Sequence, residues 1–232
     1  MTDEKSPIAR ITPVSTVDAA ANALRELILD GNLEPGTRLR EHEFAERLGI
    51  ARHSFRAATQ ILIGEGLLRR EPNRGVEVPV LAAGDIADIF TLRAALECEA
   101  VRLVTAAGVV PVAAQRAVSE LSALTEDAPW RDVVWPDQRF HRAIIEATDS
   151  ERLDRAYTDL QSEIVLCLVQ LRPAYSAPAE VAAEHEELLE PIIAGDAAKA
   201  ERLMRAHLDE AVENLVRLHG AKQSEPAEDG HA

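Results

Sequence analysis

Three histidines and one aspartate form a pattern that could bind a metal ion. Each histidine lies among apolar residues at helical spacing, so its side chain is expected to point into a packed core. An aspartate four residues before the first histidine places carboxylate and imidazole on the same helix face. Neutral imidazole and carboxylate suit Zn, Ni, Mn or Fe. The candidate ligands are Asp137, His141, His185 and His207.

The same pattern has a second interpretation. A single histidine on the apolar face of a helix is usually a core residue with hydrogen-bonded ring nitrogens, not a metal ligand. Three histidines with a paired aspartate leave both readings open on pattern alone. A purely structural bundle would bind neither a metal nor an effector.

The elements that would position these residues are helices in the C-terminal part of the chain. Six segments carry apolar residues at helical spacing, and Gly, Pro and polar residues separate them. Aromatic residues make up only 3% of a chain that is 47% hydrophobic, so Ala, Leu, Val and Ile must build the core. That composition favours packed helices. The expected helices span residues 85–107, 112–124, 136–147, 150–171, 178–193 and 196–218.

Prolines and a glycine mark several breaks between these helices. Pro129 and Pro136 are expected to bracket a short exposed link. Gly195 followed by Asp196 predicts the end of one helix and the start of the next. Pro191 falls inside the fifth helix, where it removes one backbone hydrogen bond and is expected to bend the segment.

Residues 41–66 predict two short helices joined by a tight turn. Apolar residues three or four apart give each helix one buried face, and Gly49 tolerates the positive φ that the turn needs. An ordinary helical hairpin would give the same pattern. A second helix with a polar, basic N-terminal end can also enter the major groove of DNA. The candidate DNA contacts on this helix are Arg52, His53, Ser54 and Arg56.

The flanking segments favour a DNA-binding domain. A helix over residues 17–30 precedes the pair, and residues 69–80 predict a β-hairpin with its turn at 72–73. A hairpin directly after a recognition helix is a wing. Arg74 at its tip, followed by Gly75, could reach a phosphate or the adjacent minor groove.

The charge is distributed unevenly along the chain. The net charge is −15, which is unusual for a DNA-binding protein. Residues 1–80 carry 11 Lys and Arg against 12 Asp and Glu, so they are almost neutral. The acidic remainder would repel DNA and help to confine contact to the N-terminal domain.

Several motifs in order resemble the DNA-binding domain of the GntR family of bacterial transcription regulators. They are ANALRELILDGNLEPGTRLRE, ERLGIARHSFRAATQIL, EGLLRR and NRGVEV, and the resemblance covers about residues 14–80. It implies that Arg38 contacts the DNA backbone. Three positions depart from the usual family residues, and Ala51 removes a hydroxyl that would contact phosphate or cap the helix. These positions are Ala51, Ala57 and Thr59.

The six C-terminal helices resemble the FCD domain of the largest branch of that family, over residues 85–218. The segments DQRFH, AEHEELL and MRAHL match those that supply an Asp and three His ligands in many FCD proteins. The resemblance therefore implies a divalent transition metal (Zn, Ni, Mn or Fe) on the four candidate ligands. Arg93 lies where the family commonly has an Arg. It is either a clamp for an effector carboxylate or an i,i+4 partner of Glu97.

The resemblance implies a ligand-responsive, sequence-specific transcription regulator, and most members of the family are repressors. Its partners would be double-stranded operator DNA, a small organic acid effector and a second copy of the chain in a homodimer. The alternative is a metal-dependent hydrolytic enzyme, since an Asp-His₃ site could activate water. No base, nucleophile or phosphate loop accompanies the four ligands.

The expected fold is mainly α: a winged helix-turn-helix with three helices and a hairpin, followed by a six-helix bundle. The expected boundaries are a flexible arm at 1–13, the winged domain at 14–80, a linker at 81–84, the bundle at 85–220 and a disordered tail at 221–232. With no signal peptide and no apolar run near 18 residues, the protein is expected to be cytoplasmic. Cys98 and Cys167 are expected to be reduced core residues.

Overall fold

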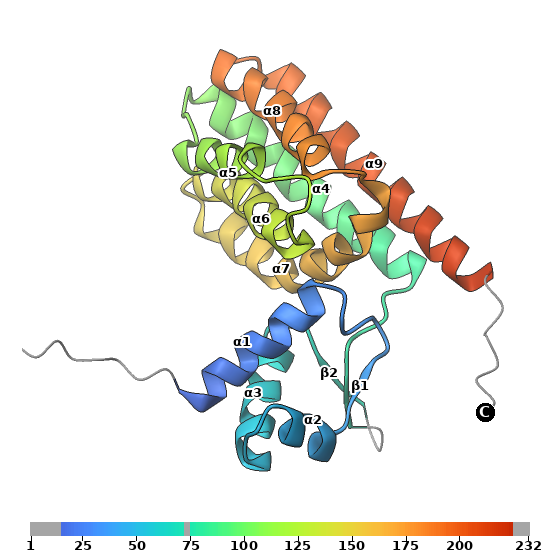
Figure 1. Ribbon diagram of the computed structural model, residues 1–232. Helices are drawn as coiled ribbons and strands as arrows, with labels where there is room; N and C mark the ends of the chain where they lie inside the picture. The colour runs from blue at the N-terminus through green and yellow to red at the C-terminus, as the bar shows by residue number, and fades with distance from the viewer. Residues whose placement is uncertain (1–14, 72–74, 225–232) are drawn as a thin grey trace, which may run out of the picture.

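The computed structural model describes residues 15–71 and 75–224. A small winged domain lies beneath a bundle of long helices (Figure 1). The described part of the chain is mainly helical, which confirms the expected fold class. The expected turn at 72–73, Arg74 and the terminal segments 1–14 and 225–232 lie outside the described residues.

The winged domain contains three helices and three short strands. Ser15 begins the first helix, because its hydroxyl accepts a hydrogen bond from the amide of Val17 at 3.2 Å. Gly49 takes a φ of +65° in the turn before the third helix, as expected for a residue without a β-carbon. The elements are α1 (Thr16–Leu29), β1 (Arg38–Leu39), α2 (Glu41–Arg47), α3 (Arg52–Gly64), β2 (Arg69–Glu71) and β3 (Gly75–Glu77).

The three strands form one antiparallel sheet in the order β1-β3-β2. The hairpin between β2 and β3 was predicted, whereas β1 was not. In β1, Arg38 pairs with Glu77 and the buried Leu39 pairs with Val76. Two residues are too few to show an alternating pattern in the sequence, so β1 can be identified only from its pairing with β3.

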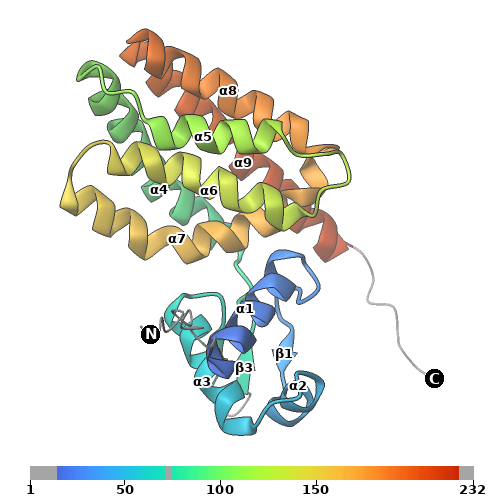
Figure 2. The same ribbon diagram turned by 60° about the vertical axis from the view of Figure 1, so that its left-hand side comes forward.

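The six helices of the bundle pack around a large shared core, with a smaller apolar cluster where α5, α6 and α8 meet. Helices α4 and α9 run side by side, and α5 lies against α6 and α8 (Figures 1 and 2). The glycine cap and the helix start that follows it are confirmed, since Gly195 has a φ of +79° and Asp196 Oδ1 accepts from the Lys199 amide at 2.9 Å. The helices are α4 (Ala83–Ala106), α5 (Val112–Ser122), α6 (Trp130–Glu146), α7 (Glu151–Leu171), α8 (Pro178–Ala194) and α9 (Ala197–Ser224), with a 3₁₀ turn η1 (Arg172–Ala174) after α7.

Two expected boundaries are wrong. The predicted link between Pro129 and Pro136 is helical, because α6 begins at Trp130 and contains Pro136. Within a helix a proline removes one backbone hydrogen bond and its ring crowds the carbonyl of residue i−4, although its fixed φ is helical. Burial of Val133 and Val134 on the same helix offsets the lost bond. Helix α9 also runs to Ser224, past the residue at which a disordered tail was expected to begin.

The two domains contact each other through α1 and the segment after α3 on one side and α6 and α7 on the other. Arg131 at the start of α6 pairs with Asp30 at the end of α1, at 2.5 Å. Gly66, at a φ of +73°, lies so close to α7 that an added β-carbon would be 2.8 Å from Cβ of Ser162. Cys98 and Cys167 are buried free thiols, as expected. None of the helices in residues 15–71 and 75–224 has the length and apolar character needed to cross a bilayer.

Candidate metal centre and nucleic-acid interface

Helices α6, α8 and α9 bring the three candidate histidines together. One ligand atom from each of His141, His185 and His207 lies within 4.8 Å of the others. Their ring centroids are 5.2–5.4 Å apart, so the three rings form a nearly equilateral triangle. The side chains of the first two are fully buried, and that of His207 is 12% exposed.

The Nδ1 atoms of His141 and His185 each have a hydrogen-bond acceptor, and that of His207 lies near a carboxylate. His141 Nδ1 lies 2.6 Å from Oε2 of Glu97. His185 Nδ1 lies 2.7 Å from the Val181 carbonyl oxygen, and His207 Nδ1 lies 3.4 Å from Oε2 of Glu184. An acceptor at Nδ1 holds the proton there and leaves the Nε2 lone pair free to bind a metal.

Asp137 completes the cluster from the same helix face as His141, as the i,i+4 spacing predicted. Its Oδ1 atom lies 3.2 Å from Nε2 of His185, which is also 3.3 Å from Nε2 of His141. Its buried Oδ2 atom has no hydrogen-bond partner among the residues that the structure describes. Three acceptor atoms this close together need a shared cation, either a proton or a metal ion.

Burial and charge set the protonation of these groups. Burial raises the pKa of Asp137, but the hydrogen bond to His185 and nearby cations lower it more, so it stays below its ordinary value. Burial lowers the pKa of His185, but Asp137 raises it by more, so this pKa lies above its ordinary value. Burial also lowers the pKa of His141, to about 4. An ionised carboxylate beside a neutral imidazole suits the metals Zn, Ni, Mn and Fe.

Arg93 and Glu97 form the i,i+4 pair that was one of the two expected arrangements. Arg93 Nε donates to Oε1 of Glu97 at 2.6 Å, and both side chains are at most 1% exposed. The other oxygen of Glu97 accepts from His141, so the pair is attached to the candidate metal centre. Burial raises the pKa of Glu97, but Arg93 and His141 lower it more, to about 2.

The sequence predicted neither carboxylate that holds a histidine. Glu97 was expected only as a partner of Arg93, and its contact with His141 crosses from α4 to α6. Glu184 precedes His185 in the chain but approaches His207 on α9. Sequence spacing within one helix reveals contacts along that helix, whereas these two depend on how separate helices pack.

A small apolar cavity adjoins the cluster. Its volume is about 20 Å³, and Arg93, Asp137 and His207 contribute to its lining. The rings of Trp130 and Tyr175 also line it and stack with centroids 5.8 Å apart.

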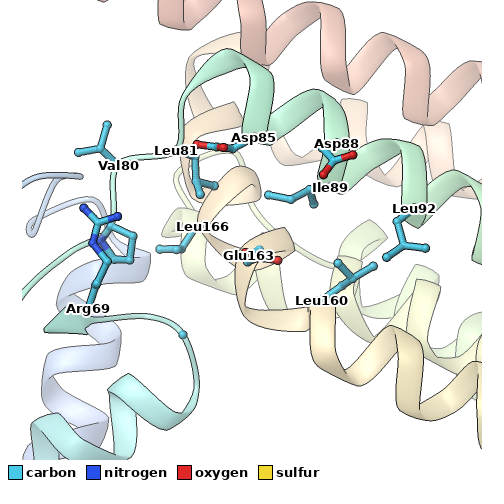
Figure 3. A pocket seen from close by; sticks show the side chains of 12 residues that line it. Arg69, Val80, Leu81, Asp85, Asp88, Ile89, Leu92, Leu160, Glu163 and Leu166 are labelled. Atoms are coloured by element: carbon cyan, nitrogen blue, oxygen red, sulfur yellow. The ribbon is translucent and has the colours of Figure 1, made fainter.

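A larger cavity of about 690 Å³ lies between the winged domain and the bundle. Figure 3 shows Arg69 and Val80 on one side of it and side chains of α4 and α7 on the other. Its titratable groups are three carboxylates and one arginine, and it holds none of the clustered histidines. It marks the junction of the two domains, whereas the metal-binding chemistry lies inside the bundle.

The candidate DNA-contacting residues lie mostly at the surface. Arg52, His53 and Arg56 on α3 are exposed, and so is Gly75 at the start of β3. Ser54 was wrongly placed on this polar face, because it is only 8% exposed. It shares the buried side of α3 with residues four and eight positions further on.

Two of the arginines pair with carboxylates in this structure. Arg56 Nε donates to Oε2 of Glu41 at 2.7 Å, and both lie at the surface. Arg38 lies in β1 with a half-exposed side chain, 3.6 Å from Glu77. Ala51 precedes α3 and supplies no side-chain hydrogen bond, in agreement with the hydroxyl that this sequence lacks.

Comparison with known proteins identifies both domains. The family described as "Bacterial regulatory proteins, gntR family" matches residues 16–78, and the FCD domain family matches residues 88–210. The HTH-type transcriptional regulator BphR of Paraburkholderia xenovorans is 28% identical, over 94% of this chain and 91% of that protein. The gluconate operon transcriptional repressor of Bacillus subtilis is 26% identical, over 94% and 92%. The crystal structure of a transcriptional regulator GntR from Rhodococcus sp. RHA1 has a TM-score of 0.72 at 27% identity, and covers 88% of this chain and 99% of that chain.

Proposed function

This chain belongs to the GntR family of bacterial regulatory proteins and carries the FCD domain, and from that premise we propose that it is a metal-containing, effector-responsive repressor. That it is a DNA-binding transcriptional regulator, and not an enzyme, follows from the family and from its relatives. The bundle would bind a small carboxylate, and binding would change the affinity for operator DNA. Because it acts on DNA, we place it in the cytoplasm.

The observation that carries the metal proposal is the arrangement of acceptors around the three histidines. The four proposed ligands are Asp137, His141, His185 and His207. The Nδ1 atoms of His141 and His185 have hydrogen-bond acceptors and that of His207 lies 3.4 Å from Glu184, so the Nε2 atoms are available for a metal. The buried Oδ2 atom of Asp137 offers one further oxygen that could bind the metal. When bound, a divalent metal would supply Lewis-acid positions for a ligand oxygen.

Arg93 is the proposed effector-binding residue. It is buried beside Asp137 and lines the small cavity, so it could meet a carboxylate that enters there. Its bond to Glu97 uses only Nε, and a guanidinium has five donors. The two expected roles of Arg93 are therefore compatible in one side chain.

Helix α4 would connect the effector site to the DNA-binding domain. It carries Arg93 and Glu97 near its middle, and its first turns hold Asp85 and Asp88 beside the interdomain cavity (Figure 3). A carboxylate that binds one placement of this helix better than another would shift the population of domain arrangements. That differential affinity sets how strongly operator binding can respond.

The DNA-contacting residues of the proposal are Arg38, Arg52, His53, Arg56, Arg74 and Gly75. The exposed end of α3 would enter the major groove, and the wing would contact the backbone or the adjacent minor groove. Two winged domains related by two-fold symmetry would read the two halves of an operator. A homodimer is therefore part of the proposal.

Selection of bound sequences from random DNA tests this function. The full-length chain, loaded with zinc, is expected to enrich an inverted repeat whose half-sites are separated by a fixed spacing. Addition of an effector from a panel of small acids is then expected to weaken binding in the metal-loaded chain and not in the chelated chain. Absence of any enriched sequence would contradict operator binding. Equal responses of the two forms would contradict the role of the metal.

A further inference from the structure

The cavity beside the metal centre combines charged groups from one cluster with an otherwise apolar wall. We infer that the effector is a small monocarboxylate with an apolar body, held by Arg93 and covered by the stacked rings of Trp130 and Tyr175. This inference rests on the proposed function and adds the chemical class of the ligand. It excludes polyhydroxylated acids and dicarboxylates as effectors of this site.

The charged part of the lining can accept one carboxylate. Arg93 is 1% exposed, and in the described part of the chain its only hydrogen bond runs from Nε to Glu97. Its terminal nitrogens can therefore form a bidentate pair with a ligand carboxylate. Arg93 is the one arginine or lysine among the residues that line this cavity, so a second carboxylate on the ligand would face the apolar wall without a counter-charge.

The rest of the lining offers almost nothing to a hydroxylated ligand. Trp130 Nε1 already donates to the Leu168 carbonyl at 3.0 Å, and the Tyr175 hydroxyl already donates to Glu184 at 3.1 Å. Each ligand hydroxyl against an apolar wall would lose its hydrogen bonds to water without replacement. The apolar lining residues are Val133, Val134, Leu168, Leu171, Val181 and Ala211.

The stacked rings must move before a ligand can enter. The cavity of about 20 Å³ holds roughly one water-sized group. Trp130 and Tyr175 are only partly buried and belong to different segments, the start of α6 and the turn before α8. Displacing them would open the apolar wall to solvent, and a ligand body would then replace their contacts.

Movement of Tyr175 would also affect the contacts of the proposed metal ligand His207. Its hydroxyl donates to Oε2 of Glu184, and the same oxygen lies 3.4 Å from Nδ1 of His207. A ligand that displaces the ring therefore frees the carboxylate that holds one proposed metal ligand. Ligand entry and metal coordination would be coupled through this chain of three residues.

The test uses the full-length chain loaded with zinc and carrying Trp135→Phe, so that Trp130 alone reports. Isovalerate is the probe, and its neutral amide, glycerate and succinate are the matched comparisons. Isovalerate is expected to raise the thermal midpoint and to change the Trp130 emission. The amide is expected to bind at least about tenfold more weakly, because it loses the charge-assisted bonds to Arg93. Glycerate and succinate are expected to bind at least about tenfold more weakly as well.

The other outcomes distinguish an error in the ligand class from an error in the proposed function. Tighter binding of glycerate or succinate than of isovalerate would overturn the apolar class. Binding of isovalerate without any change in Trp130 emission would overturn the ring cover. A chain that binds zinc but none of the four compounds would overturn the inference and leave the metal centre standing. Failure to bind zinc would instead overturn the proposed function.

Discussion

The three histidines of the candidate centre are held by acceptors from different sources: a carboxylate on α4, a backbone carbonyl within α8 and a carboxylate of α8 that reaches α9. Hydrogen bonds orient the rings of His141 and His185 without help from a metal, and Glu184 lies beside the ring of His207, so the site is largely preorganised. Preorganisation has a cost, since Arg93, Glu97, Asp137 and His141 are all buried. Removal of one partner would leave an uncompensated charge in the core.

Glu97→Gln is expected to reduce the free energy of unfolding by about 3–5 kcal/mol, because Arg93 would lose its counter-charge in a fully buried site. The matched control is Glu99→Gln on the same helix, whose surface pair with Arg102 should cost under about 1 kcal/mol. Urea denaturation measures both. Equal losses in the two variants would contradict the role assigned to Glu97.

The contribution of Glu97 should also depend on pH. Its pKa is about 2 in the folded chain, against an ordinary value of 4.5. Because the folded value is depressed, the stabilisation is fully present above the unfolded pKa and is lost as the pH falls from about 4.5 towards 2. Stability measured across this window should therefore fall more steeply in the parent chain than in Glu97→Gln. Parallel curves would show that Glu97 is not ionised in the fold.

Arg56→Ala is expected to weaken specific operator binding by about 1–3 kcal/mol and to relax the preference at one base position. In this structure Arg56 pairs with Glu41 at the surface, so it can exchange that partner for a base. The control is Arg102→Ala, which removes another surface arginine from a helix of the bundle. Fluorescence anisotropy with the selected operator gives both affinities, and an unchanged affinity for Arg56→Ala would remove it from the interface.

Helices were the elements that could be predicted most fully from the sequence. Long apolar stripes located α4, α7 and α8, and the start of α9, to within a few residues, because an amphipathic pattern repeats over several turns. Strand β1 escaped detection because two residues hold no periodicity. Ser54 was misplaced because polarity suggested an exposed face, whereas its position three residues into α3 turned it inward. The candidate metal ligands could be predicted from the sequence, whereas the residues that orient them could not.

Gly66→Ala tests the contact between α7 and the segment that follows α3. An added methyl group would meet Cβ of Ser162 at 2.8 Å, and the positive φ adds strain. Gly108→Ala is the control, since it has a similar φ of +67° but open space around the added atom. Both should lose about 1–2 kcal/mol from backbone strain. Gly66→Ala should lose about 1–3 kcal/mol more, and equal losses in denaturation would contradict a tight contact.

At the scale of the whole molecule, a stripe of apolar side chains on α4 is exposed to solvent. Leu92 and Leu103 lie three helical turns apart and therefore on one face, and they are 46% and 37% exposed. Between them lie the half-buried Leu96 and the exposed Glu99. A second copy of the chain could cover this stripe, which agrees with the proposed homodimer.

Sedimentation is expected to give a mass of twice 25.3 kDa for the parent chain. The double variant Leu92→Glu and Leu103→Glu should shift the population towards monomer, because it places charge in the covered stripe. Val112→Glu changes a residue that is 53% exposed at the start of α5 and serves as the control. A monomeric parent chain would contradict the homodimer, and a dimer that survives the double variant would place its interface elsewhere.

The most direct test of the account is the metal content of the folded chain. Loaded with zinc and freed of excess, the parent chain should retain one ion per chain, with a raised thermal midpoint. His185→Ala should retain its helical circular dichroism but lose both the ion and the increase in midpoint, while His42→Ala, which changes an exposed histidine of α2, should behave like the parent. Retention of zinc by His185→Ala, or no retained metal in the parent chain, would contradict a metal centre formed by Asp137, His141, His185 and His207.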